Sequence, residues 1–221
     1  MAHSEKAEGD TTIVFLGDSI TEAPDGYVRL VTDVLQAVRP ERWTHTVNAG
    51  VGGARSVDLP PRLRRDVLVH HPDIVTVSIG VNDVWRALDT PGLGQDVPLP
   101  VYRQAVADVL DAIGSAGARA IVLTTSVIGE DLQSEGNRLL APYNDALREL
   151  AVARGLVVAE VNEAFQRVLA APHPPQLTTD GVHLTHQGNV VLALPVLRAL
   201  GVEIDYSLAP LIGGRACQLH T

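Results

Sequence analysis

The sequence has 221 residues, a mass of 23.5 kDa and a formal net charge of −9 at pH 7. Hydrophobic residues make up 46% of the chain and charged residues 19%, which excludes a disordered chain and predicts a globular protein. The acidic balance argues against nucleic acid as a partner, because phosphate backbones bind basic surfaces. No apolar segment approaches the ~20 residues that a membrane-spanning helix needs.

Lysine and cysteine each occur once in the sequence. Lys6 is the single lysine and lies in the polar first segment, which argues against a Walker lysine or a Schiff-base lysine. Cys217 is the single cysteine, so neither an internal disulfide nor a Cys-rich metal site can form. We expect a cytoplasmic protein, because the chain has no cysteine pair and its first ten residues lack the apolar core of a signal peptide.

Apolar strand-like runs alternate with longer segments of helical period along the chain. Strands are expected at residues 12–16, 44–48, 74–79, 118–125 and 156–161. Helices are expected at residues 26–38, 56–70, 101–116, 139–154, 162–171 and 185–200, the last with a kink at Pro195. The alternation predicts an α/β protein of three layers, α/β/α, around a five-stranded parallel sheet.

The same pattern indicates how the chain is organised. We expect residues 12–201 to form a single domain, because strands and helices alternate throughout that range. Residues 1–11 are expected to be a flexible tail, and residues 202–221 an extension without assigned structure. Residues 90–100 are rich in Pro and Gly and are expected to form a surface loop, not a linker.

Polar or glycine-rich clusters follow the expected strands. Ligands of an open α/β sheet bind outside the carboxyl ends of its strands, so these clusters are candidate sites. They lie at residues 17–21, 48–53, 80–83 and, before the last helix, 180–183. Together they offer a hydroxyl, an imidazole, a carboxylate, an amide and backbone N–H groups. These are the groups that a serine acyl-transfer enzyme uses.

Each cluster also has a purely structural interpretation. Ser19 can cap a helix, residues 82–83 can begin one, and residues 180–181 form an ordinary turn pair. The glycines at 50–53 can form a tight turn. They are not a dinucleotide fingerprint, because Arg55 stands where the third glycine belongs, and this argues against a flavodoxin-like nucleotide binder.

Two further candidates are weaker. His183 and His186 have a spacing that can bind a metal, but no third ligand beyond Asp180 is evident, so we expect no metal and no other cofactor. Cys217 is expected to be a bystander and not a nucleophile, because it lies far from every expected strand end.

The clusters are more informative together than singly. Gly-Asp-Ser-Ile-Thr at 17–21, the glycine-rich turn, Gly-Val-Asn-Asp at 80–83 and Asp-Gly-Val-His at 180–183 occur in this order. The sequence resembles the SGNH hydrolase superfamily, also called GDSL lipases and esterases, from about residue 12 to residue 201. The resemblance implies a flavodoxin-like SGNH hydrolase fold. The chain has no Gly-x-Ser-x-Gly elbow, which argues against the α/β-hydrolase version of the chemistry.

The resemblance implies a catalytic triad. Ser19 matches the nucleophile, His183 the general base and Asp180 the carboxylate that orients the histidine ring. A serine hydroxyl is a poor nucleophile until a base removes its proton, so His183 must lie within hydrogen-bond distance of Ser19.

The resemblance also implies an oxyanion hole. Its donors match the backbone N–H of Ser19, the backbone N–H of Gly53 and the side-chain amide of Asn82. Gly53 is chosen because the family turn reads Asn-x-x-x-x-Gly from Asn48, and Gly52 remains an alternative. Candidates for substrate contact are Asp18, Trp85 and Arg86.

These roles imply a serine hydrolase that cleaves carboxylic esters of small or short-chain acyl groups through an acyl-enzyme intermediate. Carbohydrate O-deacetylation, lysophospholipid hydrolysis and thioester hydrolysis fit the same site, and a non-catalytic ligand-binding module on this scaffold is the second hypothesis. Aromatic residues are 4% of the chain, which cannot build an aromatic acyl groove and favours acetyl to butyryl esters. The expected partner is a small-molecule ester, and residues 85–100 and 128–137 are expected to set specificity.

Overall fold

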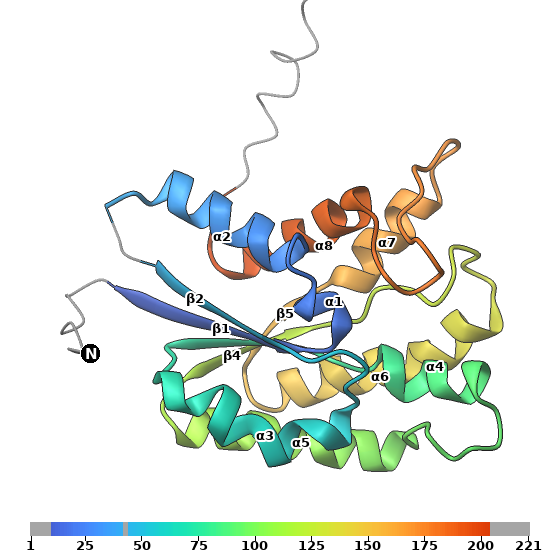
Figure 1. Ribbon diagram of the computed structural model, residues 1–221, viewed down its shortest axis with the longest axis horizontal. Helices are drawn as coiled ribbons and strands as arrows, with labels where there is room; N and C mark the ends of the chain where they lie inside the picture. The colour runs from blue at the N-terminus through green and yellow to red at the C-terminus, as the bar shows by residue number, and fades with distance from the viewer. Residues whose placement is uncertain (1–9, 42–43, 204–221) are drawn as a thin grey trace, which may run out of the picture.

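In the computed structural model, which describes residues 10–41 and 44–203, a five-stranded sheet lies between two layers of helices (Figure 1). The strands are β1 (Thr11–Gly17), β2 (Thr44–Gly50), β3 (Ile74–Ser78), β4 (Arg119–Leu123) and β5 (Val157–Ala159). All neighbouring strands are parallel, in the order β2-β1-β3-β4-β5. This architecture confirms the predicted three-layer α/β/α fold with five parallel strands.

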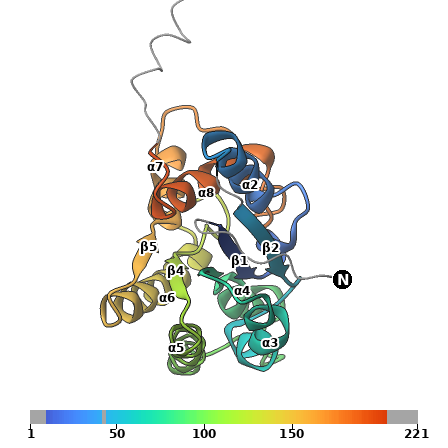
Figure 2. The ribbon, with the colours of Figure 1, turned by 90° about the vertical axis from the view of Figure 1, so that its left-hand side faces the viewer.

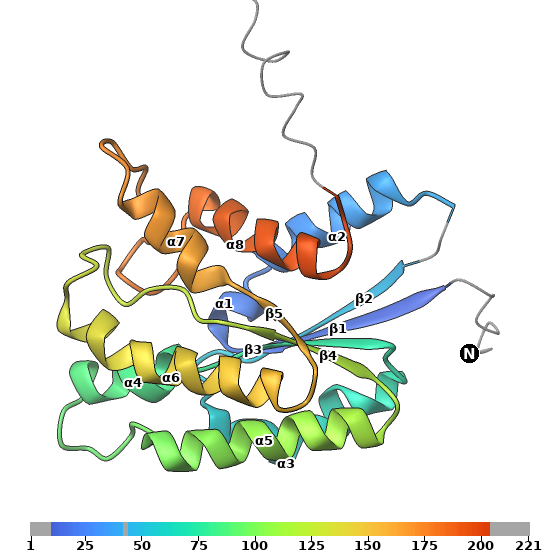
Figure 3. The ribbon, with the colours of Figure 1, turned by 180° about the vertical axis from the view of Figure 1, so that it is seen from behind.

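Helices cover both faces of the sheet (Figures 2 and 3). One face carries α2 (Tyr27–Val38), α7 (Val161–Leu169) and α8 (His186–Ala199), and the other carries α3 (Leu59–Asp66), α5 (Leu99–Ser115) and α6 (Glu135–Val152). The short helices α1 (Ser19–Glu22) and α4 (Val81–Asp89) follow β1 and β3 directly. Two 3₁₀ turns, η1 (Ser56–Asp58) and η2 (Leu68–His70), flank α3.

Strand side chains alternate between two apolar cores, as expected for a sheet covered on both faces. Ile13 and Phe15 of β1 belong to the core under α2, α7 and α8, whereas Val14 and Leu16 belong to the core over α3, α5 and α6. All four side chains are at most 2% exposed, and full burial of each stabilises the fold by about 1.5–3 kcal/mol. The sheet is therefore a rigid base for the loops at its edge.

The region after β3 differs from the sequence prediction. Residues 85–89 were expected in a loop, but they belong to α4, whose residues Val81 and Val84 are buried in the core. Gly80 precedes this helix with φ 135°, a conformation that side chains rarely adopt. The surface loop is therefore residues 90–98, since α5 begins at Leu99.

The helix expected at residues 56–70 is also wrong in detail. It is divided into η1, α3 and η2, and α3 ends where Val67 takes φ −124°. Ser56 does not cap a helix through its side chain, because its backbone N–H and its hydroxyl both donate to the carboxylate of Asp83. These hydrogen bonds join the Ser56 segment to α4 and contribute to the shape of the site described below.

Smaller differences concern the second half of the chain. Helix α6 begins at Glu135, four residues before the expected start, because the Ser134 hydroxyl accepts a hydrogen bond from Asn137 N–H. Strand β5 is shorter than expected, because the chain enters α7 at Val161. Helix α8 contains Pro195, and it begins after Thr185, whose hydroxyl accepts a hydrogen bond from Gly188 N–H.

Strand β1 begins at Thr11, inside the tail expected at residues 1–11. Most of that tail, most of the expected C-terminal extension and Cys217 lie outside the described residues, so these expectations stay predictions. Within residues 10–41 and 44–203, no helix combines the length and the apolar character that crossing a membrane requires.

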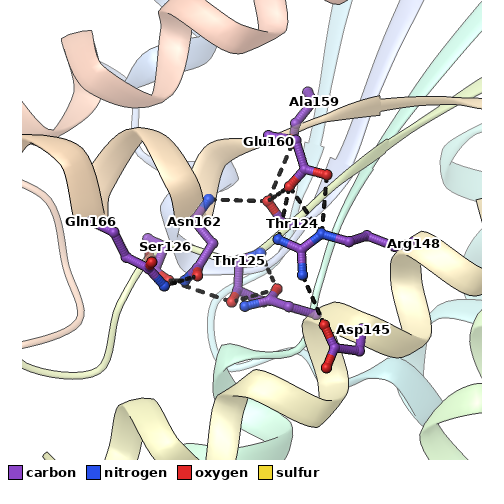
Figure 4. A network of polar contacts seen from close by, with 10 residues as sticks. Thr124, Thr125, Ser126, Asp145, Arg148, Ala159, Glu160, Asn162 and Gln166 are labelled. Atoms are coloured by element: carbon purple, nitrogen blue, oxygen red, sulfur yellow. Dashed lines mark hydrogen bonds and ion pairs between the residues drawn. The ribbon is translucent and has the colours of Figure 1, made fainter. Parts of the chain in front are cut away.

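Polar side chains close the carboxyl ends of β4 and β5 (Figure 4). The Thr124 hydroxyl accepts a hydrogen bond from Asn162 N–H at 3.0 Å, and the Asn162 amide donates to the Ser126 carbonyl at 2.7 Å. Arg148 forms an ion pair with Glu160 at 2.9 Å. These contacts join β4, α6 and α7 to one another, so this part of the sheet edge is occupied by structural hydrogen bonds. The polar clusters that follow β1, β2 and β3 lie at the other part of the same sheet edge.

Candidate active site

Strands β1, β2 and β3 end at the same level of the sheet. Gly17 of β1 is in register with Gly50 of β2 and with Ser78 of β3. Strand β1 lies between the other two, so the chain leaves it toward one side and returns on the other. This is the topological switch point at which open α/β sheets bind ligands. The clusters at residues 17–21, 48–53 and 80–83 therefore meet at this edge.

Ser19 is the first residue of α1, which follows β1 after a single residue. That residue is Asp18, whose carboxylate caps the helix by accepting a hydrogen bond from Ile20 N–H at 3.0 Å. Asp18 is 2% exposed, so the prediction that it contacts substrate is not supported. Burial, together with the charge of Asp83, raises the pKa of Asp18 to about 7, although the hydrogen bond from Ile20 N–H acts to lower it.

Two glycines allow α1 to sit directly on the strand ends. A Cβ atom on Gly17 would overlap the side chain of Thr21, and one on Gly50 would overlap the backbone of Glu22. The helix is also tied to β2, because the Asn48 amide donates to the Thr21 carbonyl at 2.6 Å. The Gly-Asp-Ser motif and the Asn48-x-Gly50 segment thus place Ser19, half-buried, above the end of β1.

Ser19, His183 and Asp180 form a continuous chain of hydrogen bonds. The Ser19 Oγ atom lies 3.1 Å from His183 Nε2, and His183 Nδ1 lies 2.7 Å from Asp180 Oδ2. A carboxylate accepts hydrogen bonds only, so the ring proton belongs on Nδ1. In that tautomer Nε2 carries a lone pair and is able to accept the hydroxyl proton of Ser19. The three residues come together although 164 positions separate Ser19 from His183.

Asp180 is held by more than the histidine ring. Its Oδ1 atom accepts backbone hydrogen bonds from Val182 N–H at 3.0 Å and His183 N–H at 2.8 Å. Partial burial acts to raise the pKa of Asp180, but the hydrogen bonds from the His183 ring and from these two N–H groups outweigh it and lower the pKa to about 2. Asp180 is therefore a carboxylate throughout the neutral range.

The loops that carry Gly53 and Asn82 are joined to each other. Gly53 has φ 73°, and the Asn82 amide donates one N–H to the neighbouring Ala54 carbonyl at 3.0 Å. One residue after Asn82 and two residues after Ala54, the carboxylate of Asp83 accepts the Ser56 N–H at 3.0 Å and the Ser56 hydroxyl at 2.5 Å. An amide nitrogen carries two protons, so Asn82 keeps a second donor for a ligand.

Asp83 is fully buried, and the sequence offered no functional role for it. Burial raises its pKa to about 6, although the Ser56 hydroxyl and N–H act to lower it. Its backbone carbonyl also accepts a hydrogen bond from Val97 N–H at 3.0 Å. Asp83 therefore fixes α4, the 53–56 turn and the loop before α5 to one another.

A pocket of about 290 Å³ borders Gly53 and is lined also by Arg55, Asp58, Arg86 and Gln95. A Cβ atom on Gly53 would lie 3.5 Å from Nη2 of Arg86, so this guanidinium stands beside the glycine turn. Of the residues predicted to contact substrate, Arg86 lines this pocket. Trp85 is half-buried and packs against the apolar core, with the Arg86 guanidinium 5.5 Å from its ring.

The sequence did not reveal what holds the 180–183 loop in place. Glu130, in the loop after β4, accepts hydrogen bonds on Oε1 from Leu177 N–H, Thr178 N–H and the Thr178 hydroxyl at 2.6–2.8 Å. Gly129 N–H donates to the Gly181 carbonyl at 2.7 Å. Sequence reasoning assigned residues 128–137 to specificity only, and no local pattern indicates these distant contacts.

The other histidine that the sequence offered as a metal ligand is His186. It is the exposed first residue of α8. Within the part of the chain that the structure describes, no three His, Cys, Asp or Glu side chains gather as metal ligands would.

Comparisons with known proteins identify the family of the chain. The family model of the GDSL-like lipases and acylhydrolases matches residues 15–191. An acetylxylan esterase of Geobacillus stearothermophilus is 31% identical over 206 residues, which cover 86% of this chain and 94% of that protein. The crystal structure of Axe2, an acetylxylan esterase from Geobacillus stearothermophilus that is 30% identical, superimposes with a TM-score of 0.82, covering 87% of this chain and 95% of that chain. An alpha/beta hydrolase enzyme from the metagenome of Lake Arreo, 31% identical, also gives 0.82, covering 86% and 95%.

The fold and these matches define a hydrolase of the SGNH superfamily. The chain belongs to the GDSL-like lipase/acylhydrolase family and is a carboxylic ester hydrolase. The resemblance inferred from the sequence motifs is thereby confirmed.

Proposed function

We propose that this esterase removes short acyl groups, acetyl above all, from the hydroxyl groups of carbohydrates, with Ser19 as its nucleophile. The observation that carries the proposal is the chain of hydrogen bonds from Ser19 through His183 to Asp180. A relative that is 31% identical is an acetylxylan esterase, and this supports the acetyl-carbohydrate part of the proposal.

The first half of the reaction forms the acyl-enzyme. His183 Nε2 takes the proton of the Ser19 hydroxyl while Oγ attacks the ester carbonyl carbon. The carbonyl oxygen becomes an oxyanion, and it is stabilised by the N–H of Ser19, the N–H of Gly53 and the second amide proton of Asn82. His183 then gives its proton to the sugar oxygen, the carbon–oxygen bond breaks and the alcohol leaves.

The second half returns the free enzyme. Water takes the place of the alcohol, gives a proton to His183 and attacks the acyl carbon. The tetrahedral intermediate collapses, His183 protonates Ser19 Oγ, and the short-chain acid leaves. Asp180 remains ionised through both halves, because its lowered pKa of about 2 keeps it a carboxylate that stabilises the imidazolium of His183.

The surroundings of the site support a polar leaving group. The pocket beside Gly53 is lined by Arg55, Asp58, Arg86 and Gln95, whose side chains offer hydrogen bonds to hydroxyl groups. A long acyl chain gains about 0.8 kcal/mol for each buried methylene, which these charged walls do not provide. We therefore place the sugar, and not a fatty chain, against this pocket.

The test is a hydrolysis panel with the purified full chain. One assay compares kcat/KM for aryl esters with acyl chains of two to sixteen carbons, without detergent. A second assay measures release of acetate from acetylated xylo-oligosaccharides, with deacetylated xylo-oligosaccharides as the control. We expect a maximum between acetyl and butyryl and release of acetate from the acetylated sugar. A maximum at ten carbons or more contradicts the proposal and favours a lysophospholipase or thioesterase.

Ser19 is tested separately with a fluorophosphonate probe. Labelling at Ser19 that is absent in Ser19→Ala supports the nucleophile, whereas absence of both labelling and hydrolysis favours the ligand-binding module. A cytoplasmic location stays a prediction from the sequence, to be checked by fractionation of the native host.

A further inference from the structure

A buried arginine lies beneath the strand ends that carry the site. Among the described residues, the buried charged side chains are Asp18, Arg62 and Asp83, and all three belong to this region. Arg62 is 7% exposed and belongs to α3. This helix covers the face of the sheet opposite α2 (Figure 2). Burial of a charge costs several kcal/mol unless partners compensate, so the contacts of this guanidinium call for an explanation.

The partners of Arg62 are mainly backbone carbonyls. Its Nη2 donates to the Gly17 carbonyl at 2.7 Å, and its Nη1 donates to the Ala49 carbonyl at 2.8 Å. Gly17 is the last residue of β1, two positions before Ser19, and Ala49 immediately precedes Gly50 at the end of β2. One guanidinium therefore joins the ends of the strand that carries the nucleophile and the strand that carries the glycine turn.

An ordinary ion pair does not explain this arrangement. The contact of Arg62 with Asp66 is 3.4 Å, longer than either carbonyl contact, and Nε has no hydrogen-bond partner. We call the two hydrogen bonds from Arg62 to the Gly17 and Ala49 carbonyls the clamp. The Gly17 carbonyl also accepts a hydrogen bond from Val51 N–H, at 3.2 Å, so the clamp is connected to the glycine-rich turn at residues 50–53. The planar guanidinium is suited to two acceptors side by side, whereas a lysine ammonium is a point charge.

We propose that Arg62 is a positioning residue of the esterase, which sets the spacing between the Ser19 segment and the 50–53 turn and so aligns the oxyanion donors. The inference rests on the proposed roles of Ser19 and Gly53. A displacement of about 1 Å in such a constellation lowers a rate by about 10²-fold, even when its cause lies outside the site. Loss of the clamp therefore acts on kcat more than on KM, since the donors bind the transition state.

The experiment uses two variants of the full chain and one control. Arg62→Met keeps the apolar stem and removes the buried charge, and Arg62→Lys keeps the charge but not the fork. Arg65→Met, on the same helix and exposed in an ion pair with Asp66, is the matched control. Each is assayed on an aryl acetate, with fluorophosphonate titration of Ser19 to count functional sites and with the melting temperature.

We expect kcat per titrated site to fall at least tenfold in Arg62→Met, with KM changed less than threefold. The variant leaves the Ala49 carbonyl without its arginine donor, so we also expect a lower melting temperature, and the count of titrated sites separates this loss of stability from the loss of kcat. Arg62→Lys is expected to recover part of kcat, and Arg65→Met to match wild type.

The proposal is overturned if Arg62→Met keeps kcat within twofold of wild type. It is also overturned if the variant loses activity but shows the wild-type kcat once activity is counted per titrated site. If Arg62→Met does not fold, the Arg62→Lys variant decides, and kcat within twofold of wild type overturns the proposal. Ser19→Ala in the same assay separates the two ideas, because activity retained there refutes the proposed nucleophile whatever the Arg62 variants do.

Discussion

Ser19, the proposed nucleophile, and His183, its proposed base, are held in opposite ways. The segments around Ser19, Gly53 and Asn82 follow directly from the ends of adjacent strands. They contain two of the three buried charged side chains of the described residues, Asp18 and Asp83. The loop of Asp180 and His183 is about half exposed, with side-chain exposures of 49% and 45%. Its backbone is fixed by hydrogen bonds to another loop, including those to Glu130.

The pKa values of the carboxyl groups also differ between the two sides of the site. Burial raises the pKa of Asp18 to about 7 and that of Asp83 to about 6 on the nucleophile side. On the base side, partial burial is outweighed by hydrogen bonds, and the pKa of Asp180 falls to about 2. The comparison indicates that the nucleophile side is positioned at a cost in charge burial, whereas the base side gains stability from its charge.

The largest effect is expected at Ser19, where the two sides of the site meet. Ser19→Ala removes the atom that His183 Nε2 contacts and leaves the helix cap of Asp18 intact. We expect kcat to fall by about 10³-fold or more with an unchanged circular dichroism spectrum, since loss of a nucleophile elsewhere costs up to ~10⁶. Ester hydrolysis measured at saturating aryl acetate checks this, and turnover above a tenth of wild type would assign the nucleophile elsewhere.

The next effect tests the nucleophile side alone. Asn82→Ala removes one proposed oxyanion donor and also the hydrogen bond to the Ala54 carbonyl. We expect a loss of about 10²–10³ in kcat, with a smaller change in KM. Asn144→Ala, at a buried asparagine in the network at the end of β4, is the control for loss of a buried amide. A pure rise in KM would place Asn82 in substrate binding instead.

A smaller effect tests the base side. Glu130→Leu leaves the Leu177 and Thr178 N–H groups without their acceptor, so the loop that carries His183 loses a brace. We expect kcat to fall about tenfold, because the brace acts on the base only through the loop. Glu130→Gln retains an oxygen acceptor and is expected to keep most of the activity. Equal activity of Glu130→Leu and wild type would show that the loop holds its position without this residue.

The two sides also differ in how far the sequence predicts them. The motifs around Ser19, Asn82 and His183 lie at strand ends or before a helix, so strand pattern and motif order suffice to bring them together. The sequence left residues 82–83 open as a turn or as the start of a helix. The structure has the helix α4 there, because Val81 and Val84 become buried in the core.

The supporting contacts were beyond the sequence for another reason. Arg62 reaches a carbonyl 45 positions away, and Glu130 reaches a backbone N–H 47 positions away. Local periodicity carries no information on such partners. One signal was present for Arg62, which follows Leu59 by three positions and so shares the apolar face of its helix. A cation on that face indicates a buried acceptor.

The smallest effect concerns stability against pH. The pKa of Asp18 is about 7 in the folded protein, above the ordinary ~3.9 of aspartate. Between pH ~4 and ~7 the folded chain therefore holds a proton that the unfolded chain has released, and stability falls as pH rises through this window. Asp83 acts in the same direction up to about 6. Asp180 acts oppositely, since the stability it adds is present above pH ~4 and is lost as pH falls toward 2.

Asp18→Asn separates these contributions, because the amide oxygen still accepts the Ile20 N–H while the ionisation is removed. We expect the melting temperature of the variant to fall less between pH 5 and pH 8 than that of wild type, and to lie above wild type at pH 8. Each 1 kcal/mol that the variant gains in free energy of unfolding raises its melting temperature by ~2–4 °C in a domain of this size. Asp25→Asn, at an exposed position, is the control and should keep the wild-type slope. If Asp18→Asn keeps that slope as well, the buried carboxylates do not oppose folding at neutral pH, and the contrast between the two sides of the site is then one of geometry alone.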